Sequence, residues 1–597
     1  MVRGSVGVIF GETGTFEFKV MVFDSSKVYR GAYVKVWHDA SSDEKDHTWV
    51  LGQVMAIKRY SDSFSIEEAM KGQRADKGDD KIVAEVVIIG SRDETGMLRS
   101  PVIPFSPGSP IFAADEGLTR SVLGLVGNEM NIGMLEGTNI KVQLSVNSLV
   151  QKHCSILAKT GSGKSYTASV LLEELLDHNI PLLILDPHSE YSSLKVEGDA
   201  STEDFKRFGV KPKGYGNSIK VYTPASKAIN PDADELFRLN GMNLTVKDLT
   251  SIFPDNFSTT HTGILYEAIQ KVRLEMETYT IEDIIFEVGN DKSKAKWNVI
   301  NVLEQIRDTG ILSPNPTSIT ELFQKGKAAV IDFKGVAPEL QSMIVASLCS
   351  GLFEARKLNQ IPPGMLVVEE AHNYAPEKGF SKTSSTDILR TIASEGRKFG
   401  LGMMVISQRP ARVDKNVLSQ CGTQVIMKVT NPNDLKAISK GLEGVNSYVE
   451  EELMRLPPGV AMLVSNDIER PVLVDIRIRK SKHGGESVNV LKAARTVTPP
   501  PPPELVETKT TASSSSASVT KSPSPVRREV PPVVSTVESH ERDVVLDIPV
   551  MDEPQQDSSF TPPPKRQPSR PPRVEGKGTE NSDSGGKLFK KLFKANR

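Results

Sequence analysis

The first residues that could do chemistry form a glycine-rich stretch, residues 158–165, with the sequence AKTGSGKS. It follows the apolar run 153–157 and precedes a segment with apolar residues at helical spacing. Glycines let backbone N–H groups close around a phosphate chain, and the N-terminus of the next helix adds unpaired donors and partial positive charge. Lys164 would reach the outer phosphates, and Ser165 would ligate magnesium. The order of strand, loop and helix favours this phosphate loop over a glycine turn with a surface lysine.

One departure from the phosphate-loop pattern is Ala158, where the pattern has its first glycine. We expect alanine to be tolerated because it adds only a methyl group, at a position farther from the phosphates than Gly161 or Gly163. The residues that we expect to contact a nucleotide, ATP, are Lys159, Thr160, Gly161, Ser162, Gly163, Lys164, Ser165 and Tyr166.

A second chemical stretch is the pair Glu369 and Glu370, which follows the apolar residues 365–368. A short buried strand of this kind presents the acids at its carboxyl end. Nucleotide hydrolysis needs one acid to hold hydrated magnesium and another to orient and deprotonate water. We assign the magnesium role to Glu369 and the catalytic role to Glu370.

A third acid, Asp186, follows the near-continuous apolar run 180–185. Because the carboxyl ends of parallel strands meet at one edge of a sheet, we expect Asp186 to lie beside the phosphate loop. It would position water or magnesium there, or it would cap a turn. His188 and Glu190 follow at the same edge, and for His188 a structural role is as plausible as a functional one.

Two further candidates are Gln408, which follows a predicted strand, and Arg397, which lies near the end of a predicted helix. The amide of Gln408 could sense the γ-phosphate, or it could belong to a plain turn. Arg397 could complement the helix dipole or contact the γ-phosphate, where an arginine can greatly accelerate phosphoryl transfer. Arg409 and Arg412 are alternative candidates for the contact with the γ-phosphate.

The elements that would position these residues come from residues 141–480, where strands alternate with helices. This pattern predicts an α/β fold with a mainly parallel sheet covered on both faces. Residues 235–325 are more polar and helical, and we interpret them as a helical insertion that packs on the core rather than offering a contact surface. Residues 1–140 contain short strands separated by turns, which predict a small β-barrel with a role in assembly or gating rather than chemistry.

The last segment, residues 481–597, is rich in Pro, Ser, Thr and charge, so we expect a disordered tail. At its end, four apolar residues share a helical face opposite lysines; they are Leu588, Phe589, Leu592 and Phe593. This basic amphipathic helix would dock an additional partner, DNA or an anionic membrane surface. A solvated tail with no role fits the residues equally well.

Composition limits the function further. At 597 residues the chain exceeds a single core, and its net charge of -2 gives no overall attraction for nucleic acid, so any such binding would come from local patches or a pore. Cys154 and Cys421 fall in predicted strands and lack metal-ligand spacing with Cys349, which favours buried packing in a reducing compartment. With neither a membrane span nor a signal peptide in view, we expect a soluble, cytoplasmic protein.

Taken together, these motifs resemble the HerA family of the FtsK–HerA translocases. The stretches that carry the resemblance are KTGSGKS at 159–165, DPHSEY at 186–191, VVEEAH at 367–372, and EGRKFG at 395–400 with SQRP at 407–410. It covers about residues 1–480, and the N-terminal β region resembles the family's HAS barrel. The resemblance implies a RecA-like P-loop core with a helical subdomain, and a homohexamer that uses ATP and Mg²⁺ to translocate double-stranded DNA. It also implies a NurA-type nuclease as partner in DNA-end resection and double-strand-break repair.

The resemblance also implies roles for single residues. By position in the motifs, Glu370 is similar to the family's catalytic acid, Asp186 to a residue near the attacking water, and Arg397 to its phosphate-sensing arginine. The family has a basic residue just ahead of the phosphate-loop strand that reaches a neighbouring subunit's nucleotide, and Lys152 stands at this position.

Two functions of different classes follow from these residues. The first is an ATP-driven DNA translocase or helicase. The alternative is a ring ATPase that remodels or unfolds proteins, with the barrel as a substrate gate. A DNA clamp that binds nucleotide without turnover is a more distant third. DNA-stimulated ATP hydrolysis distinguishes the first from the others.

Overall fold

The computed structural model describes residues 2–39, 47–61, 70–71, 80–125, 127–252, 257–381, 383–441 and 447–484. Within them, the N-terminal part is a closed barrel of six strands, with β6 (Leu98–Arg99) added to the edge of β5. The ring closes because β2 pairs with both β1 and β5, while β7 joins β1 to β3. The six strands are β1 (Gly7–Thr13), β2 (Glu17–Val22), β3 (Tyr33–Asp39), β4 (His47–Ser61), β5 (Asp80–Arg92) and β7 (Pro110–Ala113).

The barrel has its own apolar interior, which the alternation of its strands predicts. In β2, Phe18, Val20 and Val22 are buried while the residues between them are more exposed. They join a cluster of buried residues drawn from the barrel alone. This arrangement confirms the predicted small β-barrel.

The second sheet has twelve strands among the described residues. Neighbouring strands are parallel from β13 through β19 and antiparallel from β19 to β9. In sheet order they are β13 (Glu235–Leu236), β12 (Ile219–Thr223), β16 (Ala328–Asp332), β11 (Leu182–Asp186), β17 (Gly364–Val368), β18 (Leu401–Ser407), β10 (Cys154–Leu157), β19 (Thr423–Ile426), β20 (Val460–Ser465), β21 (Val472–Ile476), β8 (Met130–Leu135) and β9 (Lys141–Leu144).

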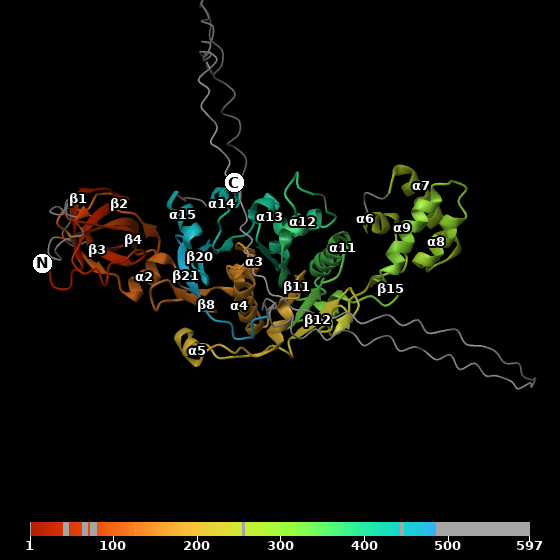
Figure 1. The fold of residues 1–597 in the computed structure, drawn as a ribbon, viewed down its shortest axis with the longest axis horizontal. Helices are drawn as coiled ribbons and strands as arrows, with labels where there is room; N and C mark the ends of the chain where they lie inside the picture. The colour runs from red at the N-terminus through yellow and green to blue at the C-terminus, as the bar shows by residue number, and fades with distance from the viewer. Residues whose placement is uncertain are drawn as a thin grey trace, which may run out of the picture. The chain divides into compact units, whose positions relative to one another are not determined.

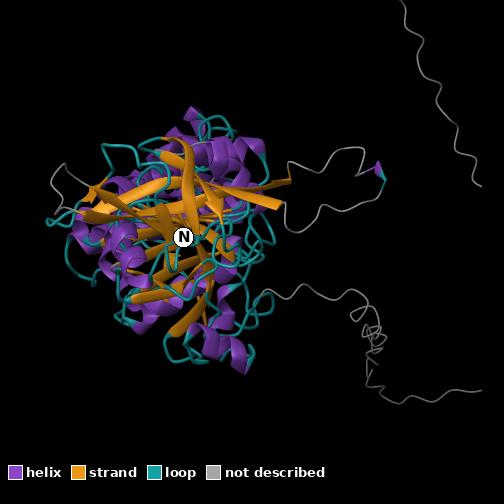
Figure 2. Ribbon diagram, turned by 90° about the vertical axis from the view of Figure 1, so that its left-hand side faces the viewer, coloured by secondary structure: helices purple, strands orange, loops and turns teal. Residues whose placement is uncertain are grey.

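Both faces of this sheet are covered by apolar cores, and Figure 2 shows helices around the strands of the molecule. Strand β11 makes the reason visible: Leu183 and Leu185 join one apolar core, and Leu182 and Ile184 join the other. The first core lies against α11 (Pro338–Lys357) and α12 (Thr386–Phe399), and the second against α3 (Val146–Gln151) and α4 (Lys164–Asp177). The predicted mainly parallel, doubly covered sheet is confirmed.

The helical insertion consists mainly of α6 (Val246–Ile252), α7 (Thr259–Glu275), α8 (Ile281–Gly289) and α9 (Lys296–Asp308), which lie together in Figure 1. Buried residues such as Leu265, Ile284 and Leu303 continue the first core into the insertion. Its surface also carries large exposed side chains, including Phe286 and Trp297. Packing on the core is therefore accompanied by exposed aromatic side chains.

The remaining elements are short or peripheral. They are α2 (Glu116–Leu123), α5 (Thr202–Phe208), α10 (Ile319–Leu322), α13 (Lys415–Leu418), α14 (Pro432–Gly441), α15 (Ser447–Arg455), the 3₁₀ turns η1 (Tyr191–Lys195), η3 (Ala371–Asn373) and η4 (Pro410–Arg412), and the strand pair β14 (Leu239–Asn240) and β15 (Leu312–Ser313).

Two local expectations differ from the structure. Strand β8 belongs to the large sheet, so that sheet begins at residue 130, ahead of the expected boundary at 140; its pairing with β21 is too distant in sequence to be read from local pattern. Cys421 lies in the turn between α13 and β19 rather than in a strand. Its burial was expected, and Cys154, Cys349 and Cys421 are all buried free thiols.

Two expectations concern residues that lie partly outside the described ranges. Across the described ranges, no helix combines the length and apolar character that crossing a bilayer would need. The expected tail, with its C-terminal amphipathic helix, lies outside the described residues, apart from positions 481–484.

The last described segment, residues 477–484, is bound along α4, and we call it the strap. Arg477 is fully buried and forms ion pairs with Glu173 at 2.9 Å and Glu174 at 2.8 Å. Lys480 pairs with Glu174 at 2.6 Å and with Asp177 at 2.7 Å. The charged side chains of α4 thus hold the chain end of the core in place.

Substituting Arg477 tests this buried network. Arg477→Met should lower the free energy of unfolding by about 3–5 kcal/mol, because it removes the nearest cation of the fully buried Glu173 and leaves only Arg479, at 4.0 Å. The control is Arg207→Met, which removes a cation that is 57% exposed and pairs with Asp475; there the loss should be below about 1 kcal/mol. Urea denaturation of both variants provides the measurement, and equal losses would contradict the assignment.

Candidate nucleotide-hydrolysis site

The order of parallel strands brings the predicted residues to one edge of the sheet. Strands β10, β18, β17, β11 and β16 are successive neighbours, and their carboxyl ends share this edge. Gln408 follows β18, which lies between the phosphate-loop strand and the strand that ends before Glu369. Asp186 ends β11, so two strands separate it from the phosphate-loop strand, and it neighbours the strand that leads to the paired glutamates instead.

The phosphate loop has the backbone that its glycines permit. Gly161 has φ of 80° and Gly163 has φ of 100°, both in the region that favours glycine. A Cβ on Gly163 would also lie 3.1 Å from the Cε of Met427. Gly163 begins α4 as its N-cap, so the free N–H groups of this helix face the loop. The methyl group of Ala158 is fully buried in the core below the loop.

The central interaction of the site joins Lys164 to both glutamates. Its Nζ donates to Oε1 of Glu369 and, at 2.6 Å, to Oε1 of Glu370. All three side chains are at least 89% buried. Burial alone would lower the pKa of Lys164, but the two carboxylates raise it above its ordinary value, so the ammonium stays charged. Burial raises the pKa of Glu369, although Lys164 opposes this shift.

Glu370 combines backbone strain with an unpaired oxygen. Its φ of 49° and ψ of 48° are left-handed, which is uncommon for a residue with a side chain. Its Oε2 is buried and has no hydrogen-bond partner among the described residues. Nδ1 of His372 lies 3.3 Å from this oxygen, and burial lowers the pKa of His372 even though Glu370 opposes the shift. The orphaned oxygen is an acceptor that a water molecule could satisfy.

Asp186 is fully buried and caps a turn. Its carboxylate accepts the backbone N–H groups of His188 and Tyr191, each at 3.0 Å. Burial raises the pKa of Asp186 to about 7, with Asp332 and Glu369 adding to the shift and the two N–H groups opposing it. The hydroxyl of Tyr191 in turn donates to Oε2 of Glu369. The turn thus links Asp186 to the glutamate pair.

Asp332 is a site residue that the sequence analysis missed. It ends β16 directly opposite Asp186 and accepts the hydroxyl of Ser189 at 2.7 Å. Ser189 is itself left-handed, with φ of 59°, and Oε2 of the next residue, Glu190, is buried without a partner in the described chain. The signal was available, because residues 328–332 form an apolar run ending in an acid, just as 182–186 do.

Polar contacts link the phosphate loop to its surroundings. The hydroxyl of Thr160 donates to Oε1 of Gln408, which connects the loop to the end of β18. Lys159 donates its backbone N–H to the carbonyl of Lys428 at 2.9 Å. The Tyr166 hydroxyl accepts the backbone N–H of Arg479 at 2.9 Å. Gln408 and the loop are therefore in direct contact before any ligand binds.

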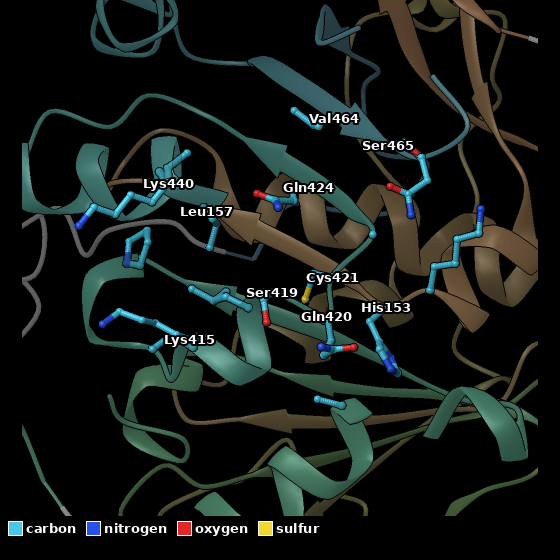
Figure 3. A pocket seen from close by; sticks show the side chains of 18 of the residues that line it. His153, Leu157, Lys415, Ser419, Gln420, Cys421, Gln424, Lys440, Val464 and Ser465 are labelled. Carbon is cyan, nitrogen blue, oxygen red and sulfur yellow. The ribbon is translucent and has the colours of Figure 1, made fainter. Parts of the chain in front are cut away.

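Lys152 and Arg397 lie at the other edge of the sheet. Lys152 precedes β10, and Arg397 is in the last turn of α12, just before β18 begins. Both line a cavity of about 1100 Å³. Figure 3 shows this cavity, with two other lining residues, His153 and Cys421, labelled. Nζ of Lys152 pairs with Asp467 at 2.8 Å. Within one chain, the structure does not bring these two cations to the phosphate loop.

This combination of fold and site defines a class. A parallel sheet carries a glycine loop, a buried lysine and paired acids at one edge, and a separate barrel precedes it. The protein has a RecA-like P-loop fold with an N-terminal barrel. The sequence profile described as "Helicase HerA, central domain" matches residues 130–352, and the one described as "HAS barrel domain" matches residues 6–95. The chain belongs to the HerA family.

Curated relatives match most of the chain. A DNA double-strand break repair helicase HerA of Sulfurisphaera tokodaii is 27% identical over 515 residues, covering 82% of this chain and 96% of that protein. A probable helicase of Methanocaldococcus jannaschii is 26% identical over 516 residues, covering 82% and 93%. The HerA of Saccharolobus solfataricus is 25% identical over 501 residues, covering 81% and 95%.

The raised pKa of Asp186 predicts a pH dependence of stability. Between about pH 4 and pH 7 the folded chain keeps a proton on Asp186 that the unfolded chain has lost, so stability falls as the pH rises through this window. In the wild-type chain, the free energy of unfolding should fall by up to about 4 kcal/mol across this window, and Asp186→Asn should abolish this decrease. Urea unfolding at pH 5 and pH 8 measures the part of this decrease that lies above pH 5, about 2.7 kcal/mol at 1.36 kcal/mol per pH unit. The exposed acid Asp387 supplies the control, since Asp387→Asn should leave the wild-type profile intact; an unchanged profile in Asp186→Asn would refute the prediction.

Proposed function

We propose that the protein is an ATP-driven translocase and helicase for double-stranded DNA, which works as a homohexamer with a NurA-type nuclease in DNA-end resection and double-strand-break repair. The observation that carries the proposal is the contact of one buried lysine, Lys164, with two glutamates at the phosphate-loop edge. The names of the HerA relatives, DNA double-strand break repair helicases, support the choice of DNA over a protein substrate.

The residues of this edge fit a magnesium nucleotide. The left-handed glycines and the free N–H groups of α4 suit phosphate, and the orphaned Oε2 of Glu370 suits a water molecule. Ser165 and, through water, Glu369 would hold the magnesium ion. When bound, this ion neutralises charge on the β- and γ-phosphates.

In the proposed mechanism, Lys164 exchanges partners. Its ammonium now neutralises Glu369 and Glu370, and the oxygens of a triphosphate would take over this role. Glu370 is then free to accept a proton from water through a carboxylate whose second oxygen has no hydrogen-bond partner among the described residues. Gln408, through its contact with Thr160, would report on the occupied loop. Asp186 holds the turn that carries Tyr191 against Glu369.

The positions of Lys152 and Arg397 support a ring. Strand β18 has seven residues, and at roughly 3.3 Å per residue its two ends lie about 20 Å apart. An arginine at one end cannot reach a phosphate at the other. In a closed head-to-tail ring, the edge with Lys152 and Arg397 would face the nucleotide of the next subunit. Hydrolysis would then be coupled to relative motion of subunits.

DNA contact is proposed through the pore of this ring. With a net charge of -2, the chain has no general attraction for DNA, so lysines and arginines on loops facing the ring axis would carry the binding. Contacts of this kind go to phosphate, depend strongly on salt and are largely indifferent to base sequence. The barrel would serve assembly or gating.

The catalytic assignment is tested by Glu370→Gln, which removes the base but keeps the shape of the side chain. ATP hydrolysis in the presence of blunt duplex DNA should fall by at least about 10²-fold. The matched control, Glu354→Gln, alters an exposed glutamate on α11 and should keep wild-type turnover. Unchanged hydrolysis in Glu370→Gln would overturn the site assignment. Stimulation by unfolded protein but not by DNA would favour the alternative, a ring ATPase that remodels proteins.

The ring is tested by mixing two inactive variants. Lys164→Ala lacks the phosphate-loop cation, and Arg397→Ala lacks the cation of the opposite edge. If each site combines both edges from neighbouring subunits, subunits mixed before assembly should recover about a quarter of wild-type ATP hydrolysis, because that share of interfaces has both residues. No recovery in mixed assemblies of confirmed composition would argue that Arg397 does not act across the interface.

A further inference from the structure

The strap brings an aromatic ring and a guanidinium from the far end of the core to the phosphate loop. The ring of His483 meets that of Tyr166 edge to face, with 5.5 Å between centroids. The guanidinium of Arg479 lies 6.0 Å from the centroid of the same tyrosine, and the backbone N–H of Arg479 holds its hydroxyl. Tyr166 directly follows Ser165, so these groups lie next to the residues expected to hold phosphate.

The end of the strap lies at the phosphate-loop edge of the sheet. A Cβ on Gly484 would come within 2.6 Å of Oγ of Ser193 and 3.1 Å of the carbonyl oxygen of Glu190. Arg479 donates to the same Ser193 hydroxyl at 3.3 Å. Ser193 and Glu190 belong to the turn that follows β11. Strand β11 ends at Asp186, where this turn begins. The strap therefore spans from the flank of α4 to the acid-bearing edge.

The position of the strap is fixed by a fully buried carboxylate. Glu173 accepts Nη1 of Arg477 at 2.9 Å, the backbone N–H of Lys480 at 3.0 Å, and both the N–H and the hydroxyl of Ser481 at 2.8 and 2.7 Å. A buried charge is tolerated when it is paired and hydrogen-bonded in this way. Glu173 lies seven residues after Tyr166 on α4, hence on the same face of that helix.

We propose that Tyr166 and His483 form the nucleoside subsite of the nucleotide site, in which the ring of His483 stacks against the purine base. This inference rests on the proposed function and deepens it. A triphosphate held at the start of α4 leaves its nucleoside to project past the residues that follow the loop. Aromatic side chains are the general stacking partners of bases. His483 is exposed and Tyr166 is half-buried, so their rings have free surface to offer.

Binding of two ligands by the full chain tests the subsite. Isothermal titration compares Mg-ATP with magnesium and inorganic tripolyphosphate, which has the phosphates but no nucleoside. His483→Ala should weaken ATP binding at least about fivefold, as loss of one stacking partner does, and should leave tripolyphosphate binding unchanged. His483→Phe should restore ATP affinity, because stacking needs a ring and not a nitrogen. The control is Lys482→Ala, an exposed neighbour whose backbone N–H holds the strap at Val196.

The outcomes separate the two proposals. Equal weakening of both ligands by His483→Ala would show a structural role of the strap, and no weakening of either would show that His483 does not contact the nucleoside; each result overturns the subsite. Failure of the wild-type chain to bind either ligand would contradict the proposed function itself, and the subsite with it.

Discussion

The cluster of Lys164, Glu369 and Glu370 is the interaction on which the arrangement of the site depends. Three ionised or ionisable groups lie together in an interior where each would be costly alone, and they are tolerated because they neutralise one another. Their surroundings support this balance: Tyr191 donates to Glu369, and a strained backbone at Glu370 aims its carboxylate at the lysine. An anion that enters the loop must compete with two carboxylates for one ammonium. The same competition releases the glutamate that is expected to act on water.

A second constraint is the polarity of the parallel sheet. The phosphate loop, the acids and Gln408 lie at the carboxyl ends of its strands. Lys152 and Arg397 lie at the opposite edge, just before β10 and β18 begin. The two sets are incomplete alone as a phosphoryl-transfer site, since the cations are a strand's length from the phosphates. Edge polarity is thus the physical argument for the proposal that the site is shared between subunits.

Local pattern predicted much of this. Apolar runs followed by glycines or acids locate β10, β11 and β17, because a buried parallel strand leaves its signature in four or five residues. Pattern does not give strand order, so the distance of Asp186 from the phosphate loop and the place of β8 in the large sheet required coordinates. Asp332 follows the same kind of apolar run, residues 328–331, but it belongs to none of the stretches that carry the family resemblance. The side of the sheet on which Arg397 lies was, by contrast, readable: a residue that ends a helix just before a strand belongs to the amino edge. The left-handed backbone of Glu370 and the strap arise from tertiary contacts that no local window contains.

The strap also has a consequence for biosynthesis. Glu173 and Glu174 leave the ribosome about 300 residues before Arg477, which at roughly 5–20 residues per second is a delay of about 15–60 seconds. During that time the two carboxylates of the nascent α4 lack the cations that pair with them in the described structure, Arg477, Arg479 and Lys480. The barrel can form without this delay, because its strands and its apolar interior lie within residues 6–113. The chain is thus expected to form its N-terminal barrel before the core, whose sheet and buried ion pairs are completed only when the last strand and the strap have been synthesised.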